Sequence, residues 1–169
     1  MRGPLFAASL AALRGMPPFG MCLAAGPAFA LDPIGTVTAQ MNGADLAWQV
    51  LRMEDGTAMV QVNDIGPLTM IDLHAMGDGD IFVGLIFPGD PSVDVPPAGI
   101  TIDMRPAGAA GPAWKSDGAP TPPLMRFERL DMDGAGRMEA GFTAVLCQGD
   151  AAAECRTVEG RIETGLGAP

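Results

Sequence analysis

Short alternating runs of apolar and polar residues are the feature that most constrains the fold of this chain. Clusters of Gly, Pro, Asn and Asp separate them, and no stretch sustains the 3.6-residue period of an amphipathic helix. The run at 37–41 stops at an Asn-Gly pair, and the run at 46–53 stops at Glu-Asp-Gly. Short runs with frequent turn signals are typical of all-β domains. The sequence therefore predicts an antiparallel β-sandwich of about nine short strands, with a small closed β-barrel as the alternative.

In the middle of the chain, two predicted strands are each followed by a proline-rich segment. Residues 81–87 are apolar at almost every position, which favours a strand covered on both faces. Residues 100–105 alternate between apolar and polar types and predict a half-buried strand. Residues 88–98 and 106–123 are rich in proline, which cannot donate a hydrogen bond to a sheet ladder. We therefore expect both proline-rich segments to be loops.

The last third of the chain predicts a hairpin with a defined register. If Cys147 and Cys155 lie opposite each other in antiparallel strands, Phe142 covers the bare backbone of Gly160. One face of the hairpin is then apolar and the other mostly polar, an agreement that a slip of one residue would destroy. The expected pairs on the apolar face are Ala144 with Val158, Phe142 with Gly160, and Ala140 with Ile162; on the other face they are Val145 with Thr157, Thr143 with Glu159, and Gly141 with Arg161.

A second hairpin is expected just upstream. Segments 124–132 and 136–147 flank an Asp-Gly-Ala-Gly turn at 133–136. Phe127 and Leu130 are out of phase, because residues three apart point to opposite faces of a regular strand. We therefore expect a bulge in the first strand of this hairpin.

Residues 1–30 have the layout of a secretory signal peptide. Two arginines are their only charges, and the stretches 5–13 and 16–25 are apolar. The segment ends in an Ala-Phe-Ala motif at 28–30, which is typical of a cleavage site. A buried N-terminal helix and a membrane anchor are the alternative interpretations.

Interruptions in this segment favour the signal peptide. Arg14 and the proline pair at 17–18 leave neither half with the roughly 18 apolar residues of a spanning helix. We predict cleavage after Ala30, leaving residues 31–169 as a single exported domain that is periplasmic or secreted.

The charge balance excludes one class of partner. The chain has 10 Lys and Arg against 20 Asp and Glu, a formal net charge of −10. All 20 acidic residues but only eight of the basic ones lie in 31–169, so this part carries −12. Phosphate contacts need clustered Lys and Arg, so we expect no nucleic-acid partner. No run of spanning length follows residue 30, so we expect no membrane span in the exported domain.

The cysteines predict a disulfide. Cys22 falls in the expected signal peptide, which leaves Cys147 and Cys155 as an even pair in an oxidising compartment. The competing interpretation is a metal site, but two thiols and the distant His74 do not make a zinc ligand set.

Catalytic chemistry has little support in the sequence. Beyond the expected signal peptide the only serines are Ser92 and Ser116, both in proline-rich segments, and His74 is the only histidine. Asp72 and His74 share one face of a predicted strand and form the only candidate for proton transfer. We expect both to face solvent while Ile71 points inward. No phosphate-binding or dinucleotide motif occurs, and we expect no cofactor.

Calcium is the better chemical alternative. Four aspartates near two predicted turns are weak candidates as ligands, because hard cations prefer several carboxylate oxygens. The segment 131–136 begins like an EF-hand loop, but Phe142 occupies the position of the bidentate Glu. Asp and Gly also suit β-turns for backbone reasons alone. The four candidates are Asp78, Asp80, Asp131 and Asp133.

These observations favour a non-catalytic exported β-domain that acts as a binding or accessory module. An unknown protein or small ligand would be engaged through the loops at 88–98 and 106–123, which are longer than simple connections need. The alternative is a carrier of a small apolar ligand, with a barrel pocket lined by Phe82, Ile86 and methionines. A calcium-binding or enzymatic domain is the third hypothesis.

Overall fold

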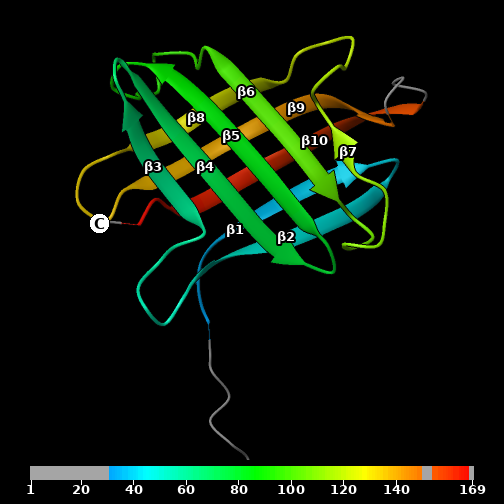
Figure 1. Cartoon of the computed structure of the whole chain (residues 1–169), viewed down its shortest axis with the longest axis horizontal. Helices are drawn as coiled ribbons and strands as arrows, with labels where there is room; N and C mark the ends of the chain where they lie inside the picture. Colours follow the sequence, from blue (N-terminus) through cyan, green and yellow to red (C-terminus); the bar gives the residue numbers. More distant parts are fainter. Residues whose placement is uncertain (1–30, 150–153, 168–169) are drawn as a thin grey trace, which may run out of the picture.

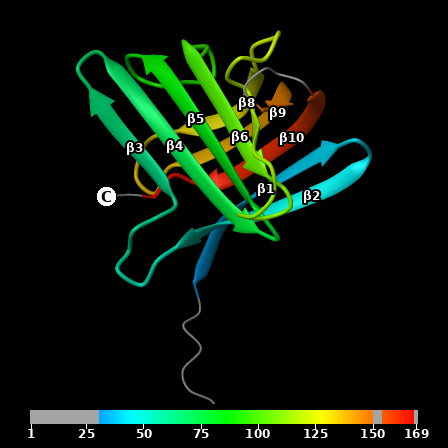
Figure 2. The same cartoon turned by 45° about the vertical axis from the view of Figure 1, so that its right-hand side comes forward.

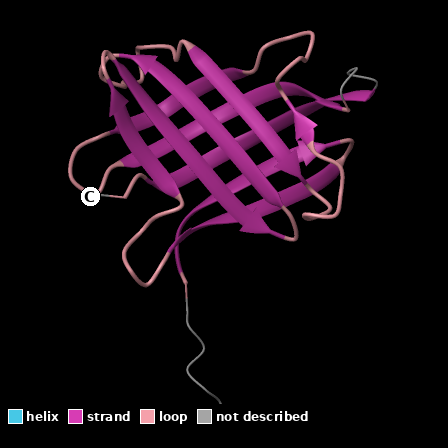
Figure 3. Cartoon of the chain, viewed as in Figure 1, coloured by secondary structure: helices cyan, strands magenta, loops and turns pink. Residues whose placement is uncertain are grey.

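The computed structural model describes residues 31–149 and 154–167, and within these ranges every regular element is a β-strand (Figure 3). The signal peptide expected at 1–30 and its cleavage after Ala30 lie outside the described residues. The strands are β1 (Asp32–Met41), β2 (Ala44–Arg52), β3 (Val60–Ile65), β4 (Leu68–Gly77), β5 (Asp80–Pro88), β6 (Gly99–Arg105), β7 (Trp114–Lys115), β8 (Leu124–Asp131), β9 (Arg137–Gln148) and β10 (Glu154–Gly165).

The strands form a closed antiparallel barrel of eight strands with two additional ones. Pairing runs in the order β10-β1-β2-β4-β5-β6-β7-β9, and β9 pairs with β10 to close the ring. β3 is added to β4, and β8 is added to β9. The all-β prediction is confirmed, and its barrel alternative describes this closure.

The barrel is flattened into two crossing layers (Figure 1). The front sheet consists of β3, β4, β5 and β6, and the back sheet consists of β8, β9, β10, β1 and β2. Strands of the two sheets run across each other in both views (Figures 1 and 2). Alternating side chains of both sheets fill the space between them, and the largest fully buried ones include Phe87, Ile71, Leu73 and Leu146.

The barrel closes through short contacts at two seams. β2 and β4 share only the pairs Trp48 with Gly77 and Gln49 with Met76. On the other side, β7 bridges β6 and β9, because Trp114 pairs with Met104 and with Gln148. Closure therefore depends on very few backbone pairs at each seam.

The expectation that 106–123 is entirely a loop is wrong at its centre. Trp114 is only 4 % exposed, and the N–H of Ile102 donates a hydrogen bond of 2.8 Å to the hydroxyl oxygen of Ser116. Proline does not prevent this pairing, because Pro112 and Pro120 flank the two-residue strand without occupying it. Burial of one large aromatic side chain thus outweighs the composition of the segment.

β5 differs in part from the prediction that both its faces are covered. Its inward side chains, such as Val83 and Leu85, are fully buried. Phe82 and Ile86 are half-buried on the outer face, because no second layer packs against that side of the front sheet. The two residues expected to line a ligand pocket in the barrel therefore point away from its interior, and that placement is corrected.

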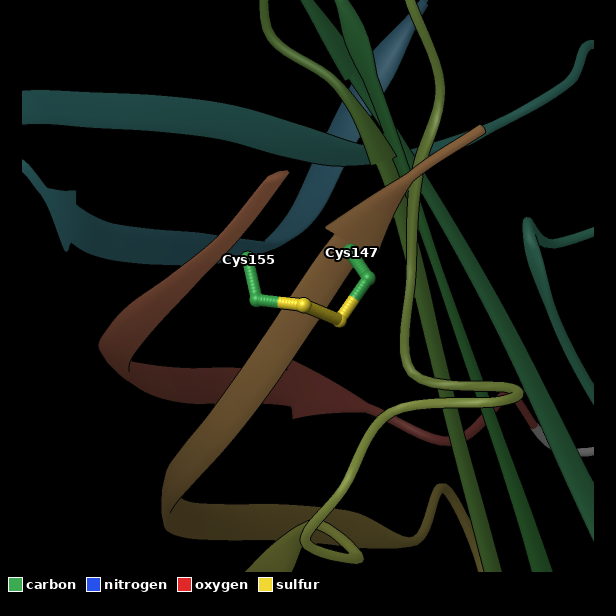
Figure 4. The surroundings of a disulfide bond; sticks show 2 residues. All are labelled: Cys147 and Cys155. Carbon is green, nitrogen blue, oxygen red and sulfur yellow. A yellow bond between two sulfur atoms is a disulfide. The ribbon is translucent and has the colours of Figure 1, made fainter. Parts of the chain in front are cut away.

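The C-terminal hairpin has the predicted register at every expected pair. Cys147 and Cys155 lie opposite each other and form a disulfide that joins β9 to β10 (Figure 4). The ring of Phe142 covers Gly160 on the inner face, as expected. The upstream hairpin of β8 and β9 is confirmed as well, with a register shift between Phe127 and Arg129 where the bulge was expected.

Removing the disulfide should destabilise the domain moderately. We expect the double variant Cys147→Ser/Cys155→Ser to lose about 2 to 3 kcal/mol of unfolding free energy, because the bond closes a short loop in the unfolded chain. Urea unfolding of residues 31–169 measures this loss. The control Thr143→Ser/Thr157→Ser changes the exposed face of the same two strands and should stay within about 0.5 kcal/mol. Two free thiols in the exported protein, seen by mass comparison with and without reductant, would contradict the assignment.

Candidate functional site

The outer face of the front sheet brings together polar and aromatic residues from four strands. His74 of β4 lies opposite Phe82 of β5, Phe82 lies opposite Asp103 of β6, and Asp103 lies opposite Lys115 of β7. The rings of His74 and Phe82 are in contact, with centroids 4.8 Å apart. We call these four residues the outer row. They are separated by up to 41 positions in sequence but are neighbours on one surface because of the strand order.

Asp103 is the unusual member of the outer row. Its carboxylate oxygen Oδ1 is buried and accepts no hydrogen bond within the described residues. Burial raises the pKa of Asp103 above its ordinary value, while the nearby charges of Lys115 and Arg105 partly offset this effect. Asp117 adds a further upward contribution to this pKa, and the backbone N–H of Ser116 lowers it slightly. The carboxylate of Asp103 is therefore incompletely compensated by its own protein.

Two hollows in the surface meet at Asp103. One has a volume of about 350 Å³, and the other, of about 370 Å³, lies on the side of Lys115, Ser116 and Asp117. The first combines the apolar surface of Phe82 and two methionines with charged groups. Its polar and large apolar lining residues are Met59, His74, Met76, Asp80, Phe82, Asp103 and Arg105.

The charges around the first hollow leave an acidic excess. Asp80 pairs with Arg105, whose nitrogen is 3.4 Å from the carboxylate oxygen, at a solvent-exposed position. Asp103 then remains in a hollow that Phe82, Met59 and Met76 also line. A carboxylate and an aromatic side chain in one hollow suit an organic cation.

The proton-transfer pair considered in the sequence, Asp72 and His74, lies on β4 of the front sheet. Asp72 and His74 lie on the outer face, while Ile71 is fully buried as expected. Within the described residues the His74 ring makes no hydrogen bond and its ring contact is with Phe82. The hydroxyl of Ser116 is used to fix the backbone of β6.

The four candidate calcium ligands are divided between two turns. Asp78 and Asp80 belong to the β4–β5 connection, and Asp80 pairs with Arg105. In the β8–β9 turn, the N–H of Asp133 donates to the side chain of Asp131 at 3.1 Å. Across residues 31–149 and 154–167, no three His, Cys, Asp or Glu side chains converge as metal ligands.

The two proline-rich segments lie at opposite ends of the β5–β6 pair. Segment 88–98 follows the end at which Ile86 pairs with Gly99. Segment 106–123 begins at the other end, where Asp80 pairs with Arg105. Segment 106–123 then continues through β7 and runs back beside β6, where Ser116 and Asp117 line a hollow together with Ile100 and Thr101.

Sequence reasoning identified the outward position of Asp103 but not its neighbours. The alternation in 100–105 places Thr101, Asp103 and Arg105 on one face. Only the strand order shows that Phe82 and His74 lie beside that face. The sequence signal for this site was Asp103, an acidic residue between the apolar residues Ile102 and Met104 of a predicted strand.

No protein-family model, curated protein or solved structure matches this chain. In the part of the chain that the structure describes, no helix has the length and apolarity needed to cross a membrane. The disulfide is compatible with export to an oxidising compartment. Functional inference therefore starts from the surface chemistry of the outer row.

Proposed function

We propose that this protein is an exported, non-catalytic binding module that recognises a cationic group on a partner protein or a small ligand. The observation that carries the proposal is the position of Asp103, whose poorly compensated carboxylate lies beside Phe82 at the meeting point of two hollows. A cation placed there would offset the cost of burying this charge.

The rest of the molecule supports a cationic partner. The segment 31–169 carries a net charge of −12, which attracts and orients positively charged molecules before contact. Phe82, Met59 and Met76 offer an apolar surface next to the carboxylate. The favoured group is therefore an ammonium or guanidinium attached to an apolar body.

The proposal predicts selective binding of small organic cations. We expect benzylammonium to shift amide NMR signals of β4, β5 and β6, while benzoate, which has a similar size and the opposite charge, shifts none of them. Asp103→Asn should weaken this binding about fivefold or more, because it keeps the side-chain shape and removes the charge. The titration is done on residues 31–169 at low ionic strength.

A second variant shows whether benzylammonium binding depends on the charge of Asp103 itself or only on the net charge of the protein. Asp45 lies exposed on β2 of the back sheet, so Asp45→Asn makes the same change in net charge away from the outer row. We expect it to bind benzylammonium like the unmodified protein. Equal weakening by both variants, or no shifts in β4 to β6, would overturn the proposal. Parallel titration with the peptide Gly-Arg-Gly distinguishes a partner side chain from a small amine as the preferred source of the cation.

A further inference from the structure

A second surface, separate from the outer row, lies at the border of the front sheet. β3 pairs with β4 on one side only. Figure 2 shows β3 at the end of the front sheet, and none of the described strands lies beside its other edge. A groove of about 760 Å³ runs along β3. The groove is lined on one side by Val60 and Val62 and on the other by Met132, Gly134, Leu166 and Gly167.

The hydrogen-bond phase of β3 shows which backbone groups face the open edge. The N–H of His74 donates to the carbonyl of Met59 at 2.8 Å, so these residues form a hydrogen-bonded pair in line with the β3–β4 register. Hydrogen-bonded pairs recur at every second residue of an antiparallel ladder. Val60, Val62 and Asp64 therefore direct their backbone N–H and C=O groups away from β4, toward the open edge.

Side chains on the inward face of β3 are unusually exposed. Val62 shares its face with Ile71, which is fully buried, yet Val62 is 37 % exposed. The difference arises because β3 extends beyond the opposing sheet and borders the groove instead of the core. An additional strand along β3 would cover Val62 and fill part of this groove.

The two added strands of the molecule treat their free edges differently. Natural sheets protect such edges with charges, prolines and bulges. β8 carries exposed Arg126, Glu128 and Arg129 and a bulge at that point. β3 has an unbroken register, contains no Lys, Arg or Pro, and carries Asp64 as its one charged residue. Its edge is therefore less protected than that of β8, which points to β3 as an edge kept available for pairing.

The charges around the groove favour a basic occupant. Asp55 lines the groove, Asp64 lies on β3, and Asp131 and Asp133 flank Met132 of the opposite wall. Arg52 is the one basic residue in the lining. A second copy of this chain would bring its own net charge of −10 to the same place, so like-charge repulsion disfavours self-pairing.

We propose that β3 accepts an extended segment of a partner protein as an additional antiparallel strand, and that this segment alternates apolar residues with Lys or Arg. Its backbone would pair with Val60, Val62 and Asp64. Its basic side chains would lie on the groove side, with their apolar stems against Val62 and their charges near Asp55 and Asp64, and its apolar residues would lie on the opposite face. This mode of recognition takes affinity from main-chain hydrogen bonds and selectivity from alternate side chains.

Direct binding measurements test this assignment. The probe is a nine-residue fluorescent peptide of alternating valine and arginine, with an alternating valine and glutamate peptide as its counterpart. We expect the basic peptide alone to bind residues 31–169 and to slow amide hydrogen exchange at Val62 and Asp64. Binding without protection at these two amides, or no binding, would overturn the proposal.

Backbone and charge variants of β3 test the mode of binding. Val62→Pro removes an N–H that faces the open edge and breaks no bond to β4, so it should weaken binding about tenfold with little change in melting temperature. Val62→Lys keeps the backbone donor and places a charge in the groove, and it should weaken binding even if the proline variant folds poorly. Gln49→Lys adds the same charge at an exposed position of β2 outside the groove lining and should bind normally.

The remaining outcomes are also decisive. Equal weakening by Gln49→Lys and Val62→Lys would show general charge repulsion and overturn pairing in the groove. Concentration-dependent dimerisation that Val62→Pro abolishes would identify a second copy as the occupant and overturn the assignment to a partner segment. Asp103→Asn leaves β3 unchanged, so retained peptide binding in that variant separates this surface from the outer row.

Discussion

Replacing Trp114 by alanine is expected to destabilise the folded domain by about 3 to 5 kcal/mol, the usual cost of truncating a buried tryptophan. Trp114 is 4 % exposed and belongs to the two-residue strand that connects β6 to β9. The guanidinium of Arg156 lies 4.5 Å from the centroid of its ring and covers it from the end of the barrel. Its loss would remove packing at one of the two seams that close the barrel.

Thermal and urea unfolding of residues 31–169 measure this effect. We expect the melting temperature to fall by roughly 10 to 20 °C. Thr143→Ser changes an exposed residue of β9, the strand that pairs with β7, and should stay within about 0.5 kcal/mol. Deletion of 107–119 should prevent folding because it removes β7 entirely. A folded deletion variant would show that the barrel closes without this strand.

Gly160→Ala is expected to destabilise the domain by about 3 kcal/mol, at the upper end of the usual cost of overpacking. A Cβ atom at this position would lie 2.2 Å from Cζ of Phe142 and 2.6 Å from the backbone oxygen of Thr38. The ring of Phe142 is enclosed in the core, and Thr38 is fixed by pairing on β1. Neither neighbour can move aside without disturbing other contacts.

Gly141 provides the matched control for this prediction. It lies on β9 opposite Arg161, and a Cβ atom there would have its nearest neighbour at 3.9 Å. Gly141→Ala should therefore be neutral or slightly stabilising, because alanine costs less conformational entropy than glycine. Urea unfolding of both variants gives the comparison. Similar stability of the two would show that Phe142 adjusts easily and does not require glycine at 160.

Local parts of this fold were predictable in detail. Cys147 and Cys155 defined a register that also matched Phe142 with Gly160, and the structure has the same pairs. The phase conflict between Phe127 and Leu130 located the bulge in β8. In both cases the residues that pair are close in sequence, so side-chain alternation restricts the possible registers to one.

The candidate sites depended on information that the sequence did not contain. The outer row combines His74, Phe82 and Asp103, and the groove combines β3 with the chain around Met132 and Leu166. Alternation shows which face of a strand a residue occupies but not which strand lies beside it. The role of 106–123 was missed for the same reason, since Trp114 is buried only because β6 and β9 meet there.

The sequence by itself determined the short alternating strands, the two C-terminal hairpins and the acidic character of the domain, because each follows from local periodicity or from composition. The tertiary structure alone decided that the sheet closes into a barrel, that Phe82 and Ile86 face outward, and that β3 is left with a free edge. These features require pairing between distant segments, such as β10 with β1 and β7 with β9. Such pairing is selected by the shared burial of the whole core, which no single segment encodes.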